Sequence, residues 1–223
     1  MKAMILAAGY GKRLRPLTET TPKPLLPVSG KPMLQHHIER LSALGVTELV
    51  VNTSWLAEQI EDYFGDGHRF GVSIRWSREQ QPLETGGGIA NALPLLGNEP
   101  FLLINGDVWT DFPLRLIRDK KLEANTDGWL LLVENPDHNP QGDFALHDHQ
   151  VTYEGSPKYT FAGISLLRPQ LFPAHPMAEP CFPLRDILRP AINANRIGGE
   201  VYTGDWCDVG TVERYQKINQ QLK

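Results

Sequence analysis

Short runs of apolar residues alternate with segments of helical period along the first half of this 223-residue chain. The runs are typical of buried strands, whereas apolar residues that recur every three or four positions predict amphipathic helices. Strands are expected at residues 2–8, 48–52, 72–76 and 100–105, and helices at 32–44 and 56–64. A glycine turn at 86–88 is expected to open a third helix. This alternation predicts βαβ units around a mostly parallel sheet.

From Gly128 onward the pattern shifts toward extended structure, which indicates mixed or antiparallel strands covering the mouth of the core. Strands are expected at residues 129–133, 144–153, 159–167 and 200–203, and helices at 184–195 and from 211. The chain shows no internal repeat, low-complexity tract or linker. We therefore expect a single domain over residues 1–223.

The composition permits one full hydrophobic core and limits the partners. Hydrophobic residues make up 41% of the chain, and 22 Lys and Arg nearly balance 26 Asp and Glu, for a formal charge of -4. That balance gives no global reason to bind nucleic acid or a membrane, so any phosphate binding must be local. The first apolar run stops at Gly9, far short of the roughly 20 residues that a membrane span requires.

Cysteine and histidine positions do not suggest a metal centre. Cys181 and Cys207 fit neither a disulfide framework nor a repeated ligand spacing, which favours a reducing cytoplasm. Adjacent His36 and His37 lack the same-face spacing of a helical metal pair. Both histidines are expected to be ordinary surface residues.

The densest chemical signal is the glycine-rich loop that follows the first strand. Gly9 and Gly11 let backbone N–H groups approach a phosphate chain, while Lys12, Arg13 and Lys23 supply positive charge. These residues predict a polyphosphate site.

Two common phosphate loops do not fit this segment. A Walker loop requires Ser or Thr after its lysine, where this chain has Arg13. A dinucleotide loop passes straight into a helix, which the prolines between residues 16 and 27 prevent. We expect the loop to stay extended and to wrap its ligand.

Asp107 is the first candidate metal ligand. It follows the buried run at residues 100–105, and side chains at the carboxyl ends of such strands face the site edge of the sheet. Hard cations prefer carboxylate oxygens. Gly-Asp is also a common turn, so the position alone does not decide between the two interpretations.

The loop resembles the signature of the sugar-phosphate nucleotidyltransferases, G-x-G-x-R-L-x-P-L-T with a downstream P-K-P. The match falls on Gly9, Gly11, Arg13, Leu14, Pro16, Leu17, Thr18, Pro22, Lys23 and Pro24. The resemblance covers nearly the whole chain and implies a doubly wound, Rossmann-like α/β fold with a mixed, mostly parallel central sheet. It also implies a nucleotide-binding half over about 1–110 and a sugar-binding half over about 111–223.

The resemblance implies roles for the charged residues. Leu6, Ala8, Gly9, Gly11, Lys12 and Arg13 would bind the nucleotide, with Gly9, Gly11 and Arg13 on its triphosphate, and Arg13 and Lys23 would act in catalysis. The segment at 206–211 resembles the closing motif W-x-D-x-G-T, in which the aspartate shares Mg²⁺ with the strand-end aspartate. Asp208 and Asp107 would then be the metal ligands, and Asp205 a surface turn.

Base and sugar residues also follow from the resemblance. Residues 79–88 resemble the base-reading segment E-x-x-P-L-G-T-A-G, with Glu84 where glycine is usual. The base contacts would come from Gln80 or Gln81, Thr85, Gly86 and Gly87. The sugar contacts would come from Asn105, Gly142, Asp143, Glu154, Lys158 and Gly163. Residues 155–158 break the family's E-K-P pattern. Whether Lys158 replaces the lysine of that pattern therefore stays open.

The implied reaction joins a nucleoside triphosphate to a sugar 1-phosphate and releases pyrophosphate. Within the family, the sequence is most similar to short bacterial members that use UTP and N-acetylmuramic acid α-1-phosphate in peptidoglycan recycling. Alternatives are mannose 1-phosphate with GTP, glucose 1-phosphate with dTTP or UTP, and phosphocholine with CTP.

A non-catalytic nucleotide-sugar sensor is an alternative from another class. Such a sensor would be expected to lose a metal aspartate or the loop cations. The chain retains Asp107, Asp208, Arg13 and Lys23, which favours an enzyme.

Overall fold

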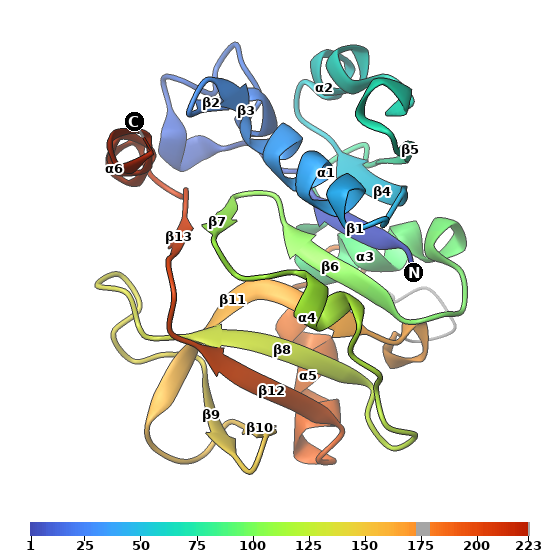
Figure 1. Cartoon of the computed structure of the whole chain (residues 1–223), viewed down its shortest axis with the longest axis vertical. Coiled ribbons are helices and arrows are strands. Elements are labelled where there is room, and N and C mark those ends of the chain that lie inside the picture. The colour runs from blue at the N-terminus through green and yellow to red at the C-terminus, as the bar shows by residue number, and fades with distance from the viewer. Residues whose placement is uncertain (173–178, 223) are drawn as a thin grey trace.

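The computed structural model describes residues 1–172 and 179–222, and its main element is a nine-stranded mixed sheet (Figure 1). The order of the strands in this sheet is β5-β4-β1-β6-β11-β8-β12-β10-β9. Its strands are β1 (Ala3–Leu6), β4 (Glu48–Thr53), β5 (Ser73–Arg78), β6 (Phe101–Asn105), β8 (Gly128–Val133), β9 (Phe144–His147), β10 (Gln150–Thr152), β11 (Lys158–Leu167) and β12 (Ile197–Tyr202). Two small sheets pair β2 (Pro27–Val28) with β3 (Lys31–Pro32) and β7 (Val108–Thr110) with β13 (Trp206–Asp208). The α-helices are α1 (Met33–Ala43), α2 (Ala57–Phe64), α3 (Glu84–Leu96), α4 (Arg115–Arg118), α5 (Leu184–Asn193) and α6 (Val212–Gln221).

The direction of the strands divides the large sheet into two parts. Strands β5, β4, β1 and β6 are parallel to one another. Strand β11 runs antiparallel to both β6 and β8, and β8 and β12 are again parallel. The predicted mixed sheet is confirmed. The carboxyl ends of β1 and β6 lie side by side, which places the loops that follow them at one edge.

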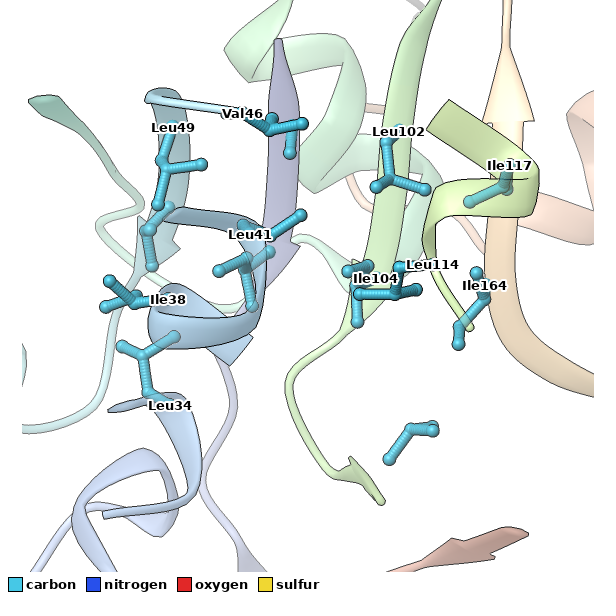
Figure 2. Packing of buried hydrophobic residues seen from close by; sticks show 14 of the residues in the cluster. Leu34, Ile38, Leu41, Val46, Leu49, Leu102, Ile104, Leu114, Ile117 and Ile164 are labelled. Atoms are coloured by element: carbon cyan, nitrogen blue, oxygen red, sulfur yellow. The ribbon is translucent and has the colours of Figure 1, made fainter. Parts of the chain in front are cut away.

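Helices cover both faces of the sheet because alternate strand residues point to opposite sides. Ala3 and Ile5 of β1 belong to the core beneath α1 and α2, whereas Met4 between them belongs to the core beneath α3 and α5. Figure 2 shows the first core, in which Leu34, Ile38 and Leu41 of α1 pack with side chains of β4 and β6. The doubly wound arrangement follows from this alternation.

The three consecutive glycines differ from the expectation, because they lie inside α3 and do not form the turn that opens it. A Cβ at Gly87 would overlap the carbonyl oxygen of Pro180, and one at Gly86 would lie 2.5 Å from the ring of Phe182. Gly86 and Gly87 are therefore required where α3 packs closely against the segment before α5, and Gly88 is required where α3 packs against Asn52 and Glu79.

Helix α6 joins the small sheets to the amino-terminal loop. Thr211 caps the helix by accepting a hydrogen bond from the backbone N–H of Arg214 (3.3 Å). Ile218 packs with Val28, Met33 and Val209 in a separate small core. No helix in the described ranges combines the length and apolar character needed to cross a membrane.

Candidate active site

A cavity of about 300 Å³ opens at the shared carboxyl edge of β1 and β6. The two strands approach closely there, since the N–H of Gly106 donates to the carbonyl of Leu6 (2.9 Å). A Cβ at Gly106 would lie 2.6 Å from that oxygen. The lining residues come from the ends of the two strands and the loops that follow them, from α3 and from the segment between β13 and α6, and are Leu6, Ala7, Ala8, Gly9, Gly11, Lys12, Arg13, Leu14, Lys23, Pro24, Thr85, Asn105, Gly106, Asp107 and Gly210.

The glycine-rich loop forms one wall of this cavity. Gly11 has φ +61°, and a Cβ there would lie 2.8 Å from Thr18, whose hydroxyl donates to the Gly11 carbonyl (2.8 Å). Lys12 and Arg13 are exposed at the cavity. The segment forms two short 3₁₀ turns, at Lys12–Leu14 and Lys23–Leu25, and no α-helix before Met33, as its prolines predict.

Lys23 and Asp107 form an ion pair at the bottom of the cavity. The Lys23 Nζ lies 2.6 Å from Asp107 Oδ2, with the two side chains 18% and 28% exposed. Burial alone would raise the pKa of the Asp107 carboxyl, but the charge and hydrogen bond of Lys23 outweigh it, and this pKa is lowered. Asp107 is therefore an anion that a cation can approach.

Asp208 is brought beside Asp107 by the short ladder between β7 and β13. Asp208 pairs with Val108 in that ladder, and the N–H of Val209 donates to the Asp107 carbonyl (2.8 Å). The sequence pattern gave no sign of either strand. Asp205, by contrast, has an exposed side chain and contributes its backbone carbonyl to Thr110.

The carboxylate of Asp208 fits a divalent cation. Burial raises its pKa, and the nearby Asp107 adds to this, while Arg214 and His138 oppose it. Arg214 Nη2 lies 3.2 Å from Oδ2, and His138 Nε2 lies 3.1 Å from Oδ1. Despite the contact with His138, Oδ1 is buried and accepts no hydrogen bond from the described residues. Two neighbouring carboxylates with a free oxygen are a suitable donor set for a hard cation.

The base-reading segment contributes fewer cavity residues than the resemblance implies. Gln80 and Gln81 are exposed and lie outside the cavity lining, which includes Thr85. Glu84 has φ +60°, so it holds the left-handed conformation for which the family uses glycine. Gly86 and Gly87 are buried against the segment before α5.

A buried pair, Asn52 and Glu79, connects the glycine-rich loop to the base-reading segment. The N–H of Ala7 donates to Asn52 Oδ1 (2.8 Å), and Asn52 Nδ2 donates to Glu79 Oε1 (2.7 Å). The N–H of Leu83 donates to Glu79 Oε2 (2.9 Å). Sequence reasoning missed Asn52, although an amide at the end of a buried strand was a usable signal.

Four of the predicted sugar residues lie around β11. Gly163 has φ +73° at an irregularity of β11, and a Cβ there would lie 2.7 Å from the amide of Asn105. Gly142 packs equally closely against Asn135. The carboxylate of Asp143 accepts a hydrogen bond from the N–H of Phe161 (2.8 Å).

Of the other two predicted sugar residues, Glu154 lies in the turn between β10 and β11 and Lys158 begins β11. Glu154 is exposed, and its carbonyl accepts a hydrogen bond from Thr152 (2.6 Å). Lys158 is half-buried, and its carbonyl accepts a hydrogen bond from Asn135 (2.9 Å). Neither side chain lines the cavity of the glycine-rich loop.

His37 lies behind Asp107 and was wrongly expected at the surface, since its side chain is 4% exposed. Burial, with a smaller effect from Arg40, lowers its pKa from 6.5 to about 4. The folded chain therefore keeps His37 neutral at a pH where the unfolded chain protonates it.

This difference predicts that the free energy of unfolding falls by about 2 kcal/mol between pH 7 and pH 5 through His37 alone. The unfolded state binds more protons in that interval, so stability rises with pH up to about 6.5. Urea unfolding of His37→Gln at both values should show a smaller loss than the wild type. His36→Gln is the matched control, and an equal pH effect in the wild type and His37→Gln would disprove the assignment.

Comparisons with known proteins agree with this geometry. The Nucleotidyl transferase family model matches residues 2–146. The chain is 50% identical over 223 residues to N-acetylmuramate alpha-1-phosphate uridylyltransferase of Neisseria meningitidis serogroup B, covering 97% of this chain and 96% of that protein. It is 32% identical to a mannose-1-phosphate guanylyltransferase of Mycobacterium tuberculosis, covering 99% of this chain and 64% of the relative.

The fold agrees as well. A Bacillus anthracis structure solved with a sucrose superposes with a TM-score of 0.87 at 24% identity, covering 100% of this chain and 95% of the other. Members of the matched family use a nucleoside triphosphate and a sugar phosphate, typically with a divalent metal. The chain belongs to the sugar-phosphate nucleotidyltransferases and is an enzyme of that family.

Proposed function

We propose that this enzyme transfers a uridylyl group from UTP to N-acetylmuramic acid α-1-phosphate in the cytoplasm, as a step of peptidoglycan recycling. An oxygen of the sugar phosphate bonds to the α-phosphorus, the bond from the α-phosphorus to the β-phosphate oxygen breaks, and pyrophosphate leaves. The relative that is 50% identical over nearly the full length of both chains supports this choice of substrates. The observation that carries the reaction type is that Asp208 lies next to Asp107, which lines the cavity of the glycine-rich loop.

The loop residues hold the triphosphate in this proposal. Gly9, Gly11 and Arg13 line the cavity, where backbone and guanidinium donors suit phosphate oxygens. Lys23 stabilises charge that develops at the α-phosphate. The sugar phosphate is already an anion, so the reaction requires neither a general base nor a covalent enzyme intermediate.

We assign the metal as Mg²⁺, held by Asp107 and Asp208. When bound, the ion neutralises charge on the reacting phosphate oxygens. The lowered pKa of Asp107 and the donor-free oxygen of Asp208 support this assignment.

The remaining contacts are assigned by segment. The uracil lies against Thr85, Gly86 and Gly87, with Gln80 or Gln81 reading its edge once the nucleotide is bound. The sugar contacts are assigned to Asn105, Gly142, Asp143, Glu154, Lys158 and Gly163. The contact of Gly163 with Asn105, a lining residue, supports the sugar side.

Pyrophosphate release across a grid of substrates tests the function. UTP, GTP, dTTP and CTP are each combined with the 1-phosphates of N-acetylmuramic acid, mannose and glucose and with phosphocholine, with and without Mg²⁺. We expect UTP with N-acetylmuramic acid 1-phosphate to give the highest kcat/KM, by at least about tenfold, and only with the metal. A maximum at GTP and mannose 1-phosphate would reassign the substrates, and tight nucleotide binding with no turnover anywhere would indicate a sensor.

A further inference from the structure

A second cavity, of about 360 Å³, lies on the other side of the paired aspartates from the glycine-rich loop. Asp107 lines the first cavity and Asp208 lines the second. The second cavity is bounded by α6, β13 and the segment that follows β8, and its lining includes His138, Arg214 and Lys217. The two cavities therefore meet at the carboxylates to which the metal is assigned.

Arg214 places a buried positive charge in the wall of this cavity. Its side chain is 15% exposed, and Nη2 lies 3.2 Å from Asp208 Oδ2. Its Nε is buried and donates to no acceptor among the described residues. A buried guanidinium with an unused donor is costly and favours an anionic ligand.

Lys217 extends the positive surface outward. It is exposed, lines the same cavity and lies three residues after Arg214, which places both on one face of α6. The acids at the rim, Asp137 and Glu213, are exposed, so water screens them more strongly than the buried guanidinium. A metal ion bound to Asp208 would also compete with Arg214 for the carboxylate of that residue.

The position of the second cavity indicates which substrate carries the anionic group that Arg214 and Lys217 would bind. The triphosphate occupies the cavity of the glycine-rich loop in the proposed function, so the second cavity, which adjoins the metal site at Asp208, is left for a part of the acceptor that extends beyond the assigned sugar contacts. N-acetylmuramic acid 1-phosphate carries two acidic groups, the 1-phosphate and the carboxylate of its lactyl ether. The 1-phosphate must reach the α-phosphate near Lys23, which leaves the carboxylate for the second cavity.

We propose that Arg214 and Lys217 bind the lactyl carboxylate and so select an acidic sugar over its neutral counterpart. The inference rests on the proposed function, since it presupposes that acceptor. Arg214 offers an N–H donor at Nε, which has no acceptor among the described residues, beside its contact with Asp208, and Lys217 supplies a second charge.

The test compares two acceptors that differ only in the lactyl group, N-acetylmuramic acid 1-phosphate and N-acetylglucosamine 1-phosphate. Lys217→Gln should lower kcat/KM for the first by about tenfold, mostly through KM, and for the second by less than about twofold. Arg214→Lys should reduce the same discrimination. If the wild type turns over the neutral sugar too slowly, its inhibition constant against the acidic sugar replaces KM.

Two control variants accompany the test. Lys121→Gln removes an exposed lysine outside this cavity, and Gln220→Ala changes an exposed residue of α6 outside the lining. Equal losses on both acceptors, or no loss with either Lys217→Gln or Arg214→Lys, would overturn the carboxylate subsite. A wild type that does not use N-acetylmuramic acid 1-phosphate would instead overturn the proposed function, which separates the two failures.

Discussion

Replacement of Asp107 or Asp208 by asparagine should lower kcat/KM by about a thousandfold or more while the fold stays intact. Asparagine keeps the shape of the side chain but loses the negative charge that a hard cation requires. Asp107 lies in the turn between β6 and β7, and Asp208 ends β13, which pairs with β7, so each variant removes one of two anionic ligands. Pyrophosphate release at saturating Mg²⁺ measures the effect.

Asp205→Asn is the matched control for these variants. Asp205 lies three residues before Asp208, with an exposed side chain, and its structural hydrogen bonds use the backbone carbonyl. Its replacement should leave turnover within about twofold of the wild type. The midpoint of urea unfolding shows whether each variant is folded. Near-normal turnover in either Asp107→Asn or Asp208→Asn would refute the metal assignment.

Some elements that hold the site could be predicted from the sequence, because their local hydrophobic pattern determines their structure. Helix α1 and strand β6 lie within one or two residues of their predicted bounds, because a helical apolar stripe and a continuous apolar run specify each of them directly. Asp107 follows β6 for the same reason, so its position at the sheet edge was also predictable.

No local sequence pattern could predict that Asp107 and Asp208 lie next to each other. Strands β7 and β13 have three residues each, too few to show a period, and they pair across almost half of the chain. Only the family resemblance placed Asp208 beside Asp107. Long-range pairing of such short strands depends on the surrounding fold and not on their own sequence.

Burial of individual residues was also set by the fold. His37 lies on the inner face of α1, against the backbone of Gly106, which no helical period of α1 could identify as its neighbour. The three glycines looked like a turn because glycine is common in turns. The requirement for the first two comes instead from Phe182 and Pro180, about a hundred residues away in sequence, and that for the third from Asn52 and Glu79.

The contact between Lys23 and Asp107 distinguishes this lysine from the other cations of the loop. Its ammonium lies 2.6 Å from the carboxylate at the bottom of the cavity, where it is 18% exposed. Lys12 and Arg13, in contrast, are exposed at the loop. A cation held at the metal carboxylate is placed to act on the reacting phosphate, whereas cations on the open loop are placed to attract the triphosphate.

Lys23→Ala should therefore lower the rate of the chemical step by about a hundredfold while the Kd for UTP changes by less than about threefold. Single-turnover measurements separate the two quantities, because they report the chemical step at saturating substrate. Saturating Mg²⁺ ensures that a change in metal affinity, caused by loss of the ion pair with Asp107, does not lower the measured rate. Lys12→Ala is the comparison variant and should show the opposite pattern, a weaker Kd with a nearly unchanged rate. A Lys23→Ala enzyme that binds UTP poorly but reacts at the normal rate would reduce Lys23 to a docking residue, and the catalytic assignment would then pass to Arg13.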